Sequence, residues 1–186
     1  MALAVVQPGQ TQARRLPGLL FTSPEPDFVC AQVYGEEVYI YGGNHSADNA
    51  NVVARVPLNQ ATDRKAYTFW NGKDWVADVR QAQPILTQIP GAVTASYNPY
   101  LGQFLVTTCR PLSSEILMYT GPSFAGPWSQ PTTAFRGLPP SSDGMDYAGI
   151  EHPELAKNGG RTVYVSYFNT TGFLTGDLRF VEVHFG

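Results

Sequence analysis

Residues 92–120 read AVTASYNPYLGQFLVTTCRPLSSEILMYT, and the fold depends on the pattern in this stretch. An apolar segment is followed by the turn residues 98–102 (NPYLG), a second apolar segment, the polar residues 110–115 and a third apolar segment. Asn and Gly tolerate the positive φ that tight turns need, and Pro presets the other corner of such a turn. The stretch therefore predicts three consecutive antiparallel β-strands.

The same pattern occurs twice more, in residues 28–58 and 149–185, so that the copies start about 60 residues apart. In the third copy the polar loop is expected at residues 169–177 (NTTGFLTGD). A fourth strand is expected after the first two copies, at residues 66–70 and after Gly126-Pro127-Trp128-Ser129, whereas none follows the third. Both faces of these strands carry bulky residues, which favours sheets packed against two neighbours. The sequence predicts an all-β propeller of four-stranded antiparallel blades, with about three blades present.

The copies divide the chain into an N-terminal segment, residues 1–23, and blades at 24–83, 84–136 and 137–186. Because the third copy lacks a fourth strand, Leu19 to Thr22 is a candidate strand to close a blade. Three blades cannot close a ring, so we expect either self-association or further N-terminal blades.

Composition excludes several classes of partner. The formal charge of -3 comes from 12 basic and 15 acidic residues spread along the chain, which leaves no basic stripe for nucleic acid. No apolar run is long enough to cross a membrane, and the first residues lack the pattern of a signal peptide. Cys30 and Cys109 could form one disulfide, but both lie in apolar strands and are interpreted as two buried thiols.

Several phrases resemble five-bladed propeller glycoside hydrolases of the arabinanase and β-xylosidase type. They are VYIYGG, YTFWNGKDW, GPWSQP and EHPEL, and the likeness covers residues 24–186. The resemblance extends to an uncharacterised-domain family that includes endo-D-arabinanases. It implies the C-terminal half of a secreted protein that acts on or binds arabinan-type or xylan-type polysaccharides. In such enzymes the catalytic carboxylates come largely from earlier blades.

The loops that enter the innermost strands, and those between second and third strands, are expected to meet on one face of a propeller of this type. Hydrolysis of a glycoside needs two carboxyls, and Asp146 and Glu151 are the catalytic candidates. The predicted ligand-binding residues are Asp27, Asn44, His45, Asp48, Arg110, Tyr147 and His152. Trp128 is interpreted as a wedge between blades.

His152 is expected to point into the axial channel, because it follows Glu151 on an innermost strand and precedes Pro153. The resemblance implies an axial histidine near a central cation or water cluster. A metal here would be Ca²⁺, since no Cys and His residues with zinc spacing occur.

Three functions remain open: a glycoside hydrolase, a non-catalytic glycan-binding module and a protein-interaction propeller. A carboxylate pair at hydrolytic distance would favour the enzyme. An aromatic-lined pocket without such a pair would favour the binding module, and a flat apolar top would favour the interaction platform.

Overall fold

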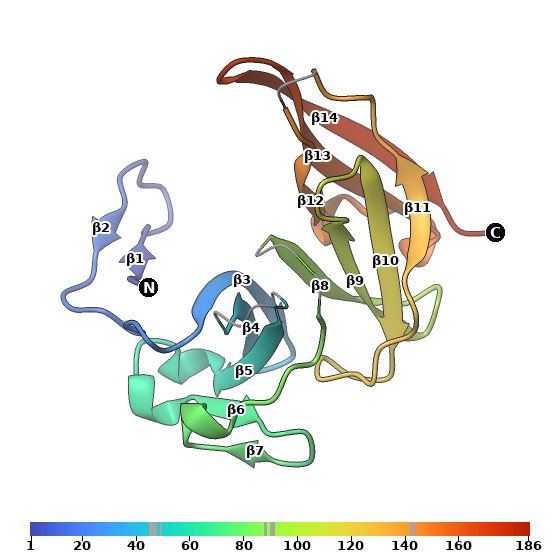
Figure 1. Cartoon of the computed structure of the whole chain (residues 1–186). Coiled ribbons are helices and arrows are strands. Elements are labelled where there is room, and N and C mark those ends of the chain that lie inside the picture. The colour runs from blue at the N-terminus through green and yellow to red at the C-terminus, as the bar shows by residue number, and fades with distance from the viewer. Residues whose placement is uncertain (45–47, 49, 88, 90–91, 142–143) are drawn as a thin grey trace.

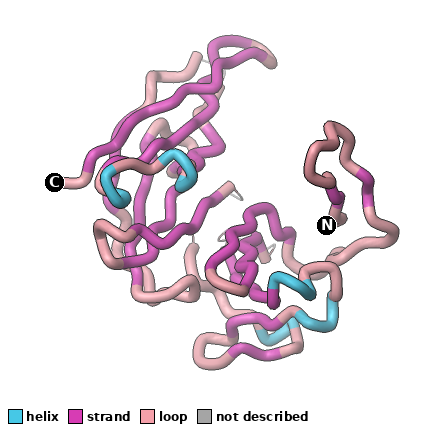
Figure 2. The backbone as a smooth tube through the Cα atoms, turned by 180° about the vertical axis from the view of Figure 1, so that it is seen from behind, coloured by secondary structure: helices cyan, strands magenta, loops and turns pink. Residues whose placement is uncertain are grey.

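A computed structural model describes all residues except 45–47, 49, 88, 90–91 and 142–143 (Figure 1). Three antiparallel sheets follow one another along the chain, preceded by a small two-stranded hairpin. In each of the three, the first strand lies at one end of the sheet and every later strand pairs with the one before it. Short 3-10 turns are the only helical elements of the described residues, as the tube in Figure 2 shows.

The first sheet has five strands, one more than expected, in the order β3-β4-β5-β6-β7. Their bounds are β3 (Asp27–Tyr34), β4 (Glu37–Gly43), β5 (Asn51–Pro57), β6 (Thr68–Trp70) and β7 (Trp75–Val76). The additional strand forms because residues 71–74 make a tight turn in which the Asn71 side chain accepts hydrogen bonds from the backbone N–H groups of Lys73 and Asp74. Trp70 and Trp75 then lie opposite each other, with ring centroids 5.4 Å apart.

The second sheet matches its prediction, with four strands in the order β11-β10-β9-β8. They are β8 (Val93–Asn98), β9 (Gln103–Cys109), β10 (Glu115–Gly121) and β11 (Thr132–Arg136). The Asn98 side chain accepts a hydrogen bond from Leu101 N, which holds the predicted turn between β8 and β9.

The third sheet contains β12 (Tyr147–Glu151), β13 (Thr162–Gly172) and β14 (Thr175–His184), in that order. The absence of a fourth strand from the described residues agrees with the sequence pattern. Residues 169–177 were expected to form a loop, and this expectation is wrong. β13 and β14 instead continue as a hairpin almost to its tip, with Asn169 paired to Asp177.

The N-terminal segment contributes to the core of the first sheet. Its hairpin pairs β1 (Ala4–Val5) with β2 (Arg14–Arg15). Leu19 to Thr22 form no strand, contrary to expectation. Phe21 is instead buried against Phe28 and Phe69, because a large aromatic side chain gains more from burial there than a short isolated strand gains from backbone pairing.

The sheets pack face to face as propeller blades do. β8 contacts both β3 and β12, so the first strands of the three sheets lie together (Figure 1). One core joins the first and second sheets through Tyr41, Val53 and Val106, and another joins the second and third through Leu105, Ile116 and Val165. The all-β, partial propeller fold predicted from the repeats is thereby confirmed.

Both cysteines are free, and burial raises the pKa of each thiol to about 11. Within the part of the chain that the structure describes, no helix has the length and apolarity of a membrane-crossing segment.

Candidate functional site

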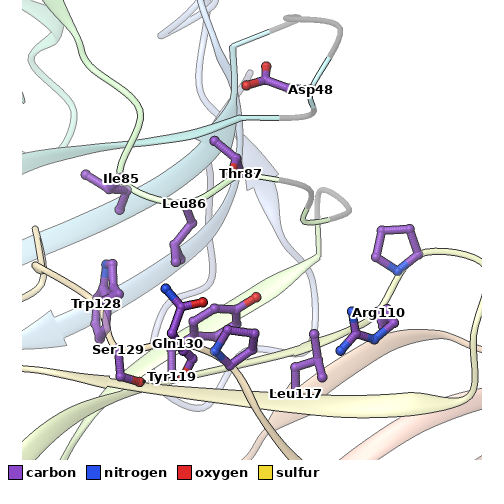
Figure 3. Close-up of a pocket in the computed structure, with 12 residues that line it drawn as sticks. Asp48, Ile85, Leu86, Thr87, Arg110, Leu117, Tyr119, Trp128, Ser129 and Gln130 are labelled. Atoms are coloured by element: carbon purple, nitrogen blue, oxygen red, sulfur yellow. Dashed lines mark hydrogen bonds between the residues drawn. The ribbon is translucent and has the colours of Figure 1, made fainter.

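A pocket with a volume of about 710 Å³ lies beside the second sheet and involves predicted site residues (Figure 3). One wall is the segment that leads into β8, and the opposite wall comes from β10 and the connection from β10 to β11. The lining residues are Asp48, Ile85, Leu86, Thr87, Arg110, Pro111, Leu117, Tyr119, Trp128, Ser129, Gln130 and Pro131. We call this pocket the crevice.

Backbone hydrogen bonds to the first sheet hold the crevice wall formed by the segment that leads into β8. Asn51 at the start of β5 donates its N–H to the carbonyl of Leu86 at 2.8 Å and accepts from Ile85 N at 2.9 Å. This pairing fixes the position of Leu86 and Thr87 relative to the first sheet. The crevice wall is therefore part of the sheet framework.

Trp128 is positioned by glycine and serine residues. A Cβ at Gly121 would lie 2.9 Å from the indole ring, so the ring rests directly on the backbone of β10. Ser129 accepts a hydrogen bond from Thr120 N at 3.0 Å, and its own N–H donates to Thr120 O at 2.8 Å. Trp128 also packs on the core between the first and second sheets. The predicted wedge is therefore present, and the same side chain lines the crevice.

Arg110 brings positive charge to the crevice. Its guanidinium pairs with Glu115, which also pairs with Arg136, and the side chain of Glu115 is only 14% exposed. Two arginines and one carboxylate leave a net positive charge in this cluster. Burial raises the pKa of Tyr119, whereas the charge of Arg110 acts on that pKa in the opposite direction.

Asp48 and Arg110 both line the crevice, so the structure brings two predicted ligand-binding residues to one pocket. They come from different blades and lie well apart along it (Figure 3). Asp27 begins β3 opposite Gly43, and Asn44 donates its backbone N–H to Ala50 O. Neither Asp27 nor Asn44 lines the crevice. His45 lies outside the described residues.

Asp146 is 3% exposed and immediately precedes β12. Its Oδ1 accepts a hydrogen bond from Asn169 Nδ2 at 2.9 Å, whereas Oδ2 has no hydrogen-bond partner among the described residues. Asp146 borders a second pocket of about 350 Å³, together with Leu112, Ser113, Ser114, Pro140, Gly144 and Met145. The sequence pattern predicts a loop at Asn169, whereas β13 extends through this residue and brings its side chain to Asp146.

Glu151 is also 3% exposed and lies between the second and third sheets. Ser96 Oγ donates to Glu151 Oε2 at 2.8 Å, and Glu151 N donates to Thr94 Oγ1 at 2.9 Å. Burial raises the pKa of Glu151 to about 7; the hydrogen bond from Ser96 acts in the opposite direction, and the charge of Glu154 adds to the increase.

The two catalytic candidates lie at the two ends of β12. Four residues separate Asp146 from Glu151, and the pairing of β12 with β13 is irregular between Tyr147 and Ile150. Their side chains contact different groups, Asn169 for Asp146 and Ser96 for Glu151. Hydrolysis requires carboxyls about 5 to 9.5 Å apart. A catalytic pair formed by Asp146 and Glu151 stays a prediction.

Tyr147 and His152 lie on a different surface from the crevice. The ring of Tyr147 packs on Phe168 at 4.8 Å, and that of His152 stacks on Phe180 at 5.0 Å. His152 Nε2 lies 2.8 Å from Ser166 Oγ. Among the described residues, no group of three or more His, Cys, Asp or Glu side chains is placed to hold a metal ion. A Ca²⁺ site at His152 stays a prediction.

Comparisons with known proteins agree with the fold. The model of a family described as a domain of unknown function, DUF4185, matches residues 19–172. A comparison with curated proteins finds no match. One similar solved structure is a "putative hydrolase" from Bacteroides ovatus ATCC 8483, with 15% identity and a TM-score of 0.56 over 78% of this chain.

A second similar structure is a glycoside hydrolase family 43 arabinoxylan arabinofuranohydrolase from Bacillus subtilis, solved in complex with cellotetraose. It is 15% identical, with a TM-score of 0.50 over 85% of this chain. The chain spans 38% and 37% of the lengths of these two proteins. At this identity the likeness concerns the fold alone.

Proposed function

The chain belongs to the DUF4185 family, and on that premise we propose that it is a glycan-binding portion of a carbohydrate-active propeller. The ligand is a polysaccharide of the arabinan or xylan type, and it binds in the crevice. The supporting observation is the combination in one pocket of aromatic side chains, Trp128 and Tyr119, with polar side chains from two blades.

The chemistry of the crevice suits a sugar. A furanose or pyranose ring has an apolar face that packs on an aromatic ring, and its hydroxyls need several fixed donors and acceptors. The side chains of Thr87 and Gln130 offer groups that donate and accept, Arg110 donates and Asp48 accepts. The volume of about 710 Å³ lies within the usual range of small-molecule pockets and would hold a short oligosaccharide.

Binding without cleavage is the form of this function that the geometry supports. Asp48 is the single carboxylate that lines the crevice among the described residues. An aromatic-lined pocket without a carboxylate pair favours the glycan-binding module over the hydrolase among the three functions considered. A complete hydrolytic site would require a carboxyl from blades beyond these residues, as expected for a chain that covers little more than a third of its structural neighbours.

Binding is tested by titrating arabino-oligosaccharides and xylo-oligosaccharides into the chain and measuring heat or chemical-shift changes. Replacing Arg110 by Gln should weaken binding at least about tenfold, because a charged hydrogen-bond donor is lost. Arg80→Gln is the matched control, since Arg80 is 86% exposed, pairs with Asp78 and does not line the crevice. Equal losses in both variants, or no binding to any of these oligosaccharides, would contradict the proposal.

Hydrolysis gives an independent prediction. Purified chain incubated with arabinan, xylan and aryl furanosides is expected to release no measurable product. Loss of either the general acid or the general base typically lowers the rate of hydrolysis by a factor of about 10² to 10⁴. Robust turnover that disappears in Asp146→Asn or Glu151→Gln would show that both catalytic groups lie within these residues.

A further inference from the structure

The crevice has one positively charged and one negatively charged end. Among the described residues, the charged side chains that line it are Arg110 and Asp48. They stand well apart, with Arg110 near Leu117 and Asp48 past Thr87 (Figure 3). A negatively charged group on a ligand is attracted by the first and repelled by the second. Such a group would therefore bind at the Arg110 end.

The ion pairs of Arg110 do not cancel its charge. Its partner Glu115 is shared with Arg136, because one carboxylate oxygen contacts each guanidinium. One positive charge in this group of three is left without a negative partner. Arg136 is mostly exposed and does not line the crevice, whereas Arg110 does. The excess charge is thus available to a ligand in the crevice.

Arg110 also has donors to spare. Its Nε donates to Glu115 Oε2 at 2.5 Å, while its Nη1 and Nη2 groups have no hydrogen-bond partner among the described residues. The guanidinium is a rigid planar fork, and two of its N–H groups match the two oxygens of a carboxylate. Since Glu115 contacts the Nε side, the edge formed by Nη1 and Nη2 can bind a second carboxylate.

Tyr119 provides another donor at the same end. Its hydroxyl points along the crevice toward Arg110 and has no hydrogen-bond partner within the described part of the chain, although the residue is only 7% exposed (Figure 3). Polar groups of buried side chains normally have a partner, so this hydroxyl is suited to a ligand atom. Burial raises the pKa of Tyr119 above 10, against the opposing charge of Arg110. The hydroxyl therefore keeps its proton at neutral pH and can donate it to an anion.

From these observations we infer that the crevice selects glycans that carry a carboxylate, which makes uronic acid residues the preferred ligands. Arg110 and Tyr119 bind the carboxylate, and Trp128 packs on a neighbouring sugar ring. Leu117 and the prolines of the crevice keep water away from the ion pair, which strengthens it. The inference rests on the proposed glycan-binding function and specifies which glycans bind best.

The test compares three xylo-oligosaccharides with the same backbone by isothermal titration calorimetry. One is unbranched, one carries a glucuronic acid branch, and one carries the same branch with its carboxyl reduced to an alcohol. The acidic ligand should bind at least about tenfold more tightly than the reduced one, because hydrogen bonds to a charged group are the stronger ones. This ratio should fall as salt is added, since part of the gain is electrostatic.

Three variants assign the preference to particular groups. Arg110→Gln should bring the ratio of the two affinities close to one. Tyr119→Phe should lower it severalfold and leave the thermal transition nearly unchanged, because the hydroxyl that it removes has no partner among the described residues. Arg80→Gln is the matched control for net charge and should keep the wild-type ratio, since Arg80 does not line the crevice. Circular dichroism establishes that each variant folds.

The outcomes separate this inference from the proposed function. If the acidic and reduced ligands bind wild type with equal affinity, the preference for a carboxylate is wrong, while glycan binding in the crevice stands. If Arg80→Gln lowers the ratio as much as Arg110→Gln does, long-range charge explains the preference and the inference is also overturned. If none of the three ligands binds, both the inference and the proposed function fail.

Discussion

Replacing Glu151 with Gln is expected to raise the free energy of unfolding by about 3 kcal/mol at about pH 8 and to leave it nearly unchanged at about pH 4. The carboxyl is buried between β8 and β12, and burial raises its pKa from 4.5 to about 7. The folded state therefore disfavours the ionised carboxylate. Gln keeps the size of the side chain and an oxygen that accepts from Ser96, without the charge.

The direction of the pH dependence follows from which state loses its proton first. Below the ordinary pKa of 4.5 the carboxyl is protonated in both states, so it does not make stability depend on pH. Between 4.5 and about 7 the unfolded chain ionises first, and the free energy of unfolding falls as pH rises. Above about pH 7 the carboxyl is ionised in both states, and the free energy of unfolding falls no further on its account.

Urea unfolding at several pH values measures this effect as a difference between wild type and variant, which removes the contribution of other groups. Glu154→Gln is the control, because the Glu154 side chain is 66% exposed and adds only its charge to the environment of Glu151. If Glu151→Gln destabilised the protein throughout this pH range, the carboxylate would be ionised and stabilised by its polar neighbours.

Phe21→Ala is expected to lower the free energy of unfolding by about 3 to 5 kcal/mol, the usual cost of truncating a buried Phe. The side chain is 1% exposed, and its ring centroid lies 4.7 Å from Phe28 and 5.1 Å from Tyr67. The Arg64 guanidinium lies 4.5 Å from the same centroid. Removing the ring would leave a cavity beneath the N-terminal segment.

Leu19→Ala is the matched control, since Leu19 is two residues away and 56% exposed. Its effect on the free energy of unfolding should stay within about 0.5 kcal/mol. Both values come from urea unfolding followed by tryptophan fluorescence. Similar small losses in the two variants would mean that the N-terminal segment is not part of the core of the first sheet.

Much of the fold could be predicted because its signals are local. Turn residues such as Asn98 and Gly102, and alternating apolar side chains on either side of them, mark strands whose partners are neighbours in the chain. Errors arose where local signals were ambiguous. Asn169 and the polar residues after it resemble a loop, yet cross-strand pairing with β14 extends β13 through them.

The candidate site was less predictable. Asp48 and Arg110 were predicted to lie on one face as ligand-binding loop residues, but nothing in the sequence connected Gly126-Pro127-Trp128-Ser129 with them. Trp128 was interpreted as a wedge alone. Its second role, lining the crevice, depends on how the β10–β11 connection lies against Leu86 of the preceding segment.

The order of strands, the all-β class and the three blade-like units were determined by the sequence itself, because a strand and its turn involve residues close together in the chain. Tertiary structure alone decided which side chains meet across blades. Tyr41 OH donates to Phe124 O across 83 residues, and Ser96 donates to Glu151 across 55. Such contacts depend on the packing of whole sheets, and this packing buries Glu151 between the second and third sheets and places Phe21 in the core of the first.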